Sequence, residues 1–182
     1  MKLNAAARLA TYGATSCFLL LMLAIVIKPG GLAANDGLSY YGGFLITAIP
    51  YTLGLLICAF FVWRAAETFD SKKFGHHLVA LSLRLMSVLL VGLFLTPHQI
   101  VNSIHTAFGA ALFVVQLLLT IWLVFAKMSD FASICLLATE FIGGLAAFVY
   151  LPGAHGFLLQ SQIVFQIAAW ILIIRALDKL GR

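Results

Sequence analysis

Apolar stretches about as long as a membrane-spanning helix cover most of the chain, and short polar links separate them. Only 9% of the 182 residues are charged, whereas a soluble domain carries roughly a quarter. So few charges cannot cover a water-soluble domain, so we expect the lipid bilayer to be the solvent. Six helices of about 20 residues use about 120 positions. The sequence therefore predicts an all-α, polytopic membrane protein, a six-transmembrane-helix bundle that forms one domain over residues 1–182.

Prolines, glycines and charged residues bound the predicted transmembrane helices. The six predicted helices cover about residues 10–27, 44–63, 78–96, 102–126, 131–150 and 157–176. The links after the third, fourth and fifth helices are only a few residues long, so consecutive helices are expected to be antiparallel. Residues 64–77 form the most polar segment and must lie in water.

The distribution of lysine and arginine predicts the orientation, because short cytoplasmic loops are enriched in both. With the N-terminus inside, all 11 lysines and arginines except Lys28 and Arg84 lie on the cytoplasmic side. Both termini are therefore predicted to be cytoplasmic. The net charge of +5 then reflects topology, and neither a nucleic-acid partner nor a cofactor is indicated.

Five polar side chains are expected at a similar depth inside the membrane, and ionisable groups at such depth mark candidate sites. This intramembrane polar core consists of Arg84, Gln116, Glu140, Gln162 and Gln166. Arg84 and Glu140 lie about 9 Å and about 13 Å from the cytoplasmic ends of their helices, so an ion pair is within reach. A lone carboxyl at this depth is neutral at pH 7 unless a cation meets it.

Two interpretations of this core stay open. In the first, its side chains form helix–helix hydrogen bonds that only hold the structure together, and Arg84 extends to the cytoplasmic interface. In the second, Glu140 is a functional proton-binding group, or the core binds a headgroup or a substrate.

A second polar cluster is expected at the outer face: Asp36, His98, Asn102, His105 and His155. The residues at 98, 102 and 105 share one helical face if the fourth helix starts early. Imidazole and carboxylate are zinc ligands, so one interpretation is a metal site. No HxH or HExxH motif supports it. In the alternative, Asn102 or Ser103 caps the fourth helix and the histidines lie at a wet interface.

Three stretches carry a resemblance to a known family: residues 37–42 (Gly-Leu-Ser-Tyr-Tyr-Gly), 91–96 (Val-Gly-Leu-Phe-Leu-Thr) and 105–110 (His-Thr-Ala-Phe-Gly-Ala). In this order they resemble a prokaryotic six-helix membrane family of unknown function, distantly allied to the Frag, DRAM and Sfk membrane proteins. The likeness covers roughly residues 37–125, and Tyr40 stands where that family often has an acidic residue. The resemblance implies a six-span bundle with His105 near the outer surface, and lipid-related or membrane-organising work. It carries over no catalytic residue. The predicted location is the bacterial cytoplasmic (inner) membrane.

Three functions remain consistent with the sequence. Short loops, small-residue helix faces such as Gly143 with Ala147, and the lack of a catalytic motif favour a non-catalytic protein. Its partners would be membrane lipids, other membrane proteins or further copies of the chain. The alternatives are a small proton-coupled transporter that uses Glu140, although no inverted repeat is evident, and a membrane-embedded hydrolase with a metal at the outer face.

Overall fold

The computed structural model describes residues 3–34, 37–69, 74–97, 100–150 and 157–181. Within these ranges the chain is helical and contains no strand, which confirms the predicted class. The α-helices are α1 (Ala5–Ile27), α2 (Leu45–Glu67), α3 (Phe74–Leu95), α4 (Asn102–Lys127), α5 (Phe131–Tyr150) and α6 (Leu158–Leu180). Two short 3₁₀ helices, η1 (Pro29–Ala33) and η2 (Gly37–Gly43), lie between α1 and α2.

Five of these helices, α1 to α5, are long and apolar enough to cross a membrane, as expected of an integral membrane protein. The sixth helix, α6, has 23 residues and lies where the sequence predicted it, but the five candidate spans do not include it. At one end of the bundle α1, α2, α3 and α6 extend beyond the predicted bounds. The reason is that charged residues such as Arg64 and Glu67 continue the helix beyond the apolar stretch.

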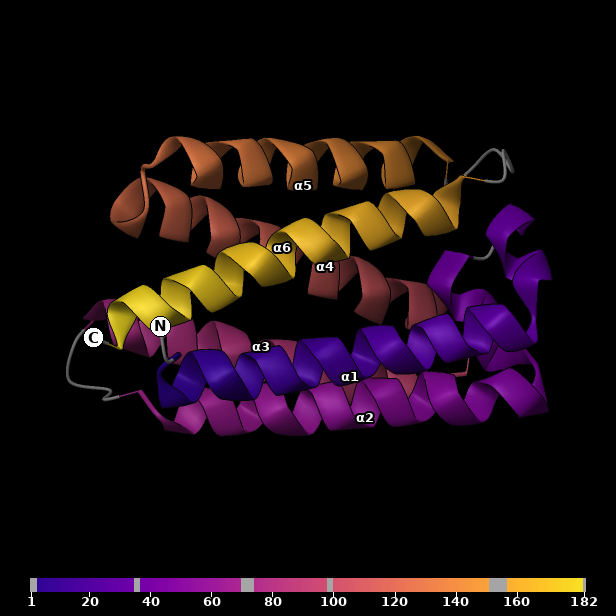
Figure 1. Ribbon diagram of the computed structural model, residues 1–182. Coiled ribbons are helices and arrows are strands. Elements are labelled where there is room, and N and C mark those ends of the chain that lie inside the picture. Colours follow the sequence, from indigo (N-terminus) through magenta and orange to yellow (C-terminus); the bar gives the residue numbers. More distant parts are fainter. Residues whose placement is uncertain (1–2, 35–36, 70–73, 98–99, 151–156, 182) are drawn as a thin grey trace.

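Successive helices alternate in direction, so the first and last described residues lie at the same end of the bundle (Figure 1). The most extensive packing is between α1 and α2 and between α5 and α6, and α3 packs against both α2 and α4. Helix α6 also contacts α1 and α4. It crosses the bundle obliquely and thereby joins the α1–α2 pair to α4 and α5 (Figure 1).

Glycines allow the closest approach between helices, as is common in membrane proteins. A Cβ atom on Gly143 would lie 2.7 Å from the backbone nitrogen of Phe165, so α5 and α6 pack backbone to backbone. A Cβ atom on Gly13 would lie 3.1 Å from the Cβ of Phe61, at the α1–α2 contact. Gly143 therefore serves a helix–helix contact within the chain.

Asn4 joins the two ends of the chain. Its Oδ1 caps α1 by accepting the N–H of Ala7 at 2.9 Å. Its Nδ2 donates to the carbonyl oxygens of Leu177 at 2.6 Å and Asp178 at 3.0 Å, at the end of α6. The backbone N–H of Asn4 donates to Asp178 Oδ1 at 3.0 Å. One side chain thus satisfies backbone groups at the start of one helix and the end of another.

The α4–α5 turn is held in place by Asp130. Its Oδ1 accepts the backbone N–H of Ser133 and its Oδ2 accepts the Ser133 hydroxyl, both at 3.0 Å. Arg175 of α6 donates to Oδ1 at 3.1 Å. These contacts, chiefly those with Ser133, hold the pKa of Asp130 below its usual range. The carboxylate therefore caps α5 and ties it to α6.

We predict that Asn4→Ala lowers the free energy of unfolding by about 1 to 2 kcal/mol, because it removes a helix cap and the bonds to α6. Thermal unfolding in detergent measures this. Asn4→Ser is the matched control. Serine can cap α1 but has no amide to donate to both α6 carbonyls, so the free energy of unfolding of this variant should lie between those of wild type and Asn4→Ala. An Asn4→Ala protein as stable as wild type would contradict the assignment.

The lowered pKa of Asp130 predicts a pH dependence. Its contribution to stability is complete above the unfolded-state pKa of about 3.9 and disappears as the pH falls through the lower folded-state pKa. Asp130→Asn keeps a capping side chain but does not titrate. Wild type should therefore exceed Asp130→Asn in melting temperature at pH 7, and the difference should shrink as the pH falls below about 4. A difference independent of pH would count against this role.

Candidate functional site

A cavity of about 90 Å³ lies inside the bundle, between α1, α2, α3, α4, α6 and η2. It is lined by Cys17, Phe18, Leu21, Leu38, Ser39, Tyr51, Leu55, Cys58, Leu90, Leu93, Leu112, Gln116, Ile163, Gln166 and Trp170. The lining is mostly apolar. For comparison, a dry apolar cavity of about 150 Å³ binds benzene, and one water needs about 10 to 15 Å³. The space therefore suits several atoms of an apolar molecule.

Two glutamines form part of the cavity wall and pair with each other. Gln116 Nε2 donates to Gln166 Oε1, and Gln166 Nε2 donates to Gln116 Oε1, each at 2.9 Å. Gln116 is only 1% exposed. The reciprocal bonds join α4 to α6 and satisfy one donor and one acceptor of each amide. The amides therefore hold the wall together and leave the lining largely apolar.

Glu140 lies on α5, fully buried, behind this pair. Its Oε1 is 3.0 Å from the hydroxyl of Thr120, which is also 3.0 Å from the carbonyl oxygen of Gln116 one turn back on α4. Its Oε2 has no hydrogen-bond partner among the described residues. Thr120 thus links the carboxyl group of Glu140 on α5 to the backbone of Gln116 on α4.

The structure does not bring Arg84 to Glu140, so the ion pair that their depths allowed is not formed. Arg84 is exposed on α3, with its guanidinium carbon 5.9 Å from the ring centroid of Trp63 on α2. Helix α3 packs against α2 and α4 rather than α5. Depth along the helices placed the two groups at a similar level, but Arg84 lies beside α2 whereas Glu140 contacts Thr120 of α4.

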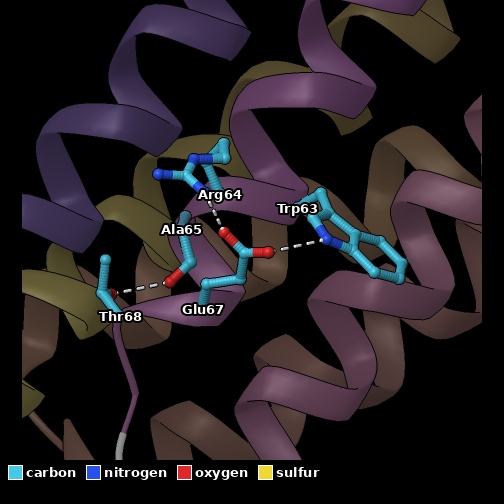
Figure 2. Close-up of polar contacts among 5 residues, drawn as sticks. All are labelled: Trp63, Arg64, Ala65, Glu67 and Thr68. Carbon is cyan, nitrogen blue, oxygen red and sulfur yellow. Dashed lines mark hydrogen bonds and ion pairs between the residues drawn. The ribbon is translucent and has the colours of Figure 1, made fainter.

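A set of polar contacts around Trp63 lies at the C-terminal end of α2 (Figure 2). The Trp63 indole N–H donates to Glu67 Oε1 at 3.1 Å. Arg64 forms an ion pair with the other oxygen of Glu67. The hydroxyl of Thr68 donates to the carbonyl of Ala65 at 2.7 Å. The carboxylate of Glu67 therefore neutralises Arg64 but does not meet Arg84.

Gln162 also lies apart from the predicted core, at the other end of the bundle. Its Oε1 accepts the N–H of Leu38 at 2.8 Å. Gly37 has a φ of 57°, and a Cβ there would lie 2.3 Å from that same oxygen, so only glycine fits. Gln160 donates to the carbonyl of Leu32 at 2.8 Å. These α6 amides hold the η1–η2 segment over the end of the bundle.

His105 is buried, at 4% exposure, and not at a wet interface as the alternative interpretation of the outer-face cluster expected. Its Nδ1 lies 2.6 Å from the carbonyl oxygen of Thr96, and its Nε2 lies 2.7 Å from Ser39 Oγ. A carbonyl only accepts, so Nδ1 carries a hydrogen toward Thr96, while Nε2 shares a hydrogen bond with the Ser39 hydroxyl. His105 thereby joins η2 to the α3–α4 link beside the cavity.

The rest of the predicted outer-face cluster is only partly described. Asp36, His98 and His155 lie outside the described residues. Asn102 is exposed and accepts a bond from Thr106 at 3.2 Å; the N-cap position of α4 is Val101, which makes no side-chain capping bond, so the expected cap is wrong. Among the residues described, no three His, Cys, Asp or Glu side chains gather as a metal site. The zinc site stays a prediction.

Sequence reasoning missed four groups that the site uses: Ser39, Tyr51, Thr96 and Thr120. Hydroxyls are common at helix interiors, where most bond to the preceding turn, so their residue types carry little signal. Ser39, Thr96 and His105 belong to the three stretches that carry the family resemblance. Membership of these stretches was therefore the one signal in the sequence, although the spacing of the three residues did not show that they meet.

We predict that Gln116→Leu or Gln166→Leu alone costs about 1 kcal/mol, because each leaves the other amide unpaired. The double substitution should cost less than the sum, since no buried amide remains. A double-mutant cycle of unfolding in detergent measures the coupling. Gln160→Leu is the matched control and should add to Gln116→Leu without coupling, because Gln160 bonds elsewhere. Strict additivity of Gln116→Leu and Gln166→Leu would refute the pairing.

Comparison of the chain with known protein families, with curated proteins and with solved structures finds no match. The resemblance to the six-helix family therefore stays a prediction, and function has to be argued from the geometry of this chain.

Proposed function

We propose that this chain is a non-catalytic integral membrane protein whose central cavity binds the apolar part of a membrane lipid. The observation that carries the proposal is the cavity of about 90 Å³ with its largely apolar lining. Its most polar neighbours are engaged with one another: Gln116 with Gln166, and Ser39 with His105. An apolar occupant therefore needs no new hydrogen bond.

The energetics of the cavity favour such an occupant. An unfilled cavity costs about 24 cal/mol per Å³, so 90 Å³ corresponds to about 2 kcal/mol. An acyl-chain segment that fills the space recovers this energy, and it loses little hydration because it comes from the hydrocarbon of the bilayer. A polar substrate would have to leave water and find partners in a wall whose amides already bond each other.

The proposal includes the topology. In it, α6 is the sixth transmembrane helix, which agrees with its length, its packing between α5 and α1, and its junction with Asn4. The end of the bundle that holds the first and last described residues faces the cytoplasm, and the membrane is the inner membrane of a bacterium. Most described lysines and arginines lie near that end, whereas Lys28 lies at the other end, over the ring of Phe44 at 3.5 Å.

We predict that Leu112→Phe fills the cavity and weakens lipid retention about 5- to 30-fold, which corresponds to losing most of about 2 kcal/mol. Leu118→Phe is the matched control, because it is the same change on the same helix at a side chain 62% exposed to the surroundings. Mass spectrometry of lipid that copurifies in mild detergent measures retention. Wild type that retains no lipid, or equal retention by both variants, would refute the proposal.

A further inference from the structure

A second feature, outside the cavity, is a groove on the surface between α2 and α3. Its volume is about 550 Å³, within the range of about 300 to 1,000 Å³ of ligand sites. Its apolar walls include Leu56, Phe60, Val88, Val91, Leu95 and Phe108. Both helices are candidate membrane spans, so the groove faces lipid chains.

Basic and aromatic side chains stand at one end of this groove. Trp63 and Arg64 line it, and the guanidinium of Arg84 lies beside the Trp63 ring. Arg64 is paired with Glu67, which also accepts the Trp63 indole N–H (Figure 2). No carboxylate among the described residues pairs with Arg84. Two guanidiniums and one carboxylate leave this end with a net positive charge.

An exposed guanidinium inside a membrane span requires an acceptor. Arginine binds phosphate oxygens through paired N–H donors, and tryptophan favours the level of lipid headgroups. Trp63 lies one turn before Glu67, the last residue of α2, so its ring and the guanidinium of Arg84 beside it lie near one end of that candidate span. The positive charge therefore lies toward the end of the groove that is nearer the membrane surface, where a headgroup would lie.

We propose that the α2–α3 groove is a docking site for one anionic glycerophospholipid, with its phosphate at Arg84 and an acyl chain along the groove. The net positive end selects the anionic headgroup over a zwitterionic one. The ring of Trp63 keeps the guanidinium in place. This site is separate from the central cavity, so each can fail without the other.

The test is a titration of the detergent-solubilised protein with phosphatidylglycerol and with phosphatidylcholine of identical chains, followed by native mass spectrometry. Wild type should bind one phosphatidylglycerol about tenfold more tightly than phosphatidylcholine. Arg84→Gln should abolish the preference. Arg8→Gln is the matched control, an exposed arginine near the same end of the bundle but on α1, and should keep it. Equal affinities in wild type, or the same result for both variants, would overturn the proposal.

A second pair of variants leaves every charge in place and tests the groove itself. Val88→Trp fills it, whereas Val26→Trp adds the same side chain on α1, where valine is 73% exposed. Val88→Trp should weaken phosphatidylglycerol binding about tenfold, and Val26→Trp should not. Unchanged binding by Val88→Trp would overturn the proposal. So would conversion of a dimer to a monomer by Val88→Trp with lipid preference intact, since a second copy would then be the occupant.

Discussion

Hydrocarbon around the helices offers no hydrogen-bond partner, so polar side chains in this bundle are most stable where another part of the chain or the membrane surface satisfies them. The Gln116–Gln166 pair satisfies two amides inside the bundle. Arg84 follows the other course, facing outward beside Trp63. The positions of polar groups therefore follow from this constraint, and the apolar cavity is what remains between satisfied walls.

The end of the bundle near η2 shows how the same constraint shapes the site. The ring of His105 bonds both Thr96 and Ser39, so it holds the α3–α4 link against η2, while Gln162 holds η2 to α6. Ser39 also lines the cavity. One buried imidazole thus connects the packing of four elements to the wall of the proposed lipid site, and the three stretches that carry the family resemblance meet there.

The sequence could predict the helices but not how they are arranged around the bundle. Apolar length and bounding residues give the class and the approximate bounds, and the rise per residue gives depth along an axis. The side that a residue faces depends on which helices become neighbours, and that is decided by contacts such as Gly143 against the Phe165 backbone. Arg84 was therefore expected near Glu140 but lies beside Trp63, and Gln162, on the same helix as Gln166, binds η2 instead.

The two ionisable groups inside the candidate spans consequently have different environments. The hydroxyl of Thr120 has one hydrogen but lies 3.0 Å from the carbonyls of Gln116 and Leu117 and from Glu140 Oε1. A protonated Glu140 brings its own hydrogen to this contact, whereas a buried carboxylate without a cation would be costly. With Glu140 protonated the interior carries no charge there, and the positive charge of Arg84 stays on the lipid-facing surface. An uncharged interior fits the lipid chain proposed for the cavity, and the proposed headgroup contact lies on the outside of the bundle.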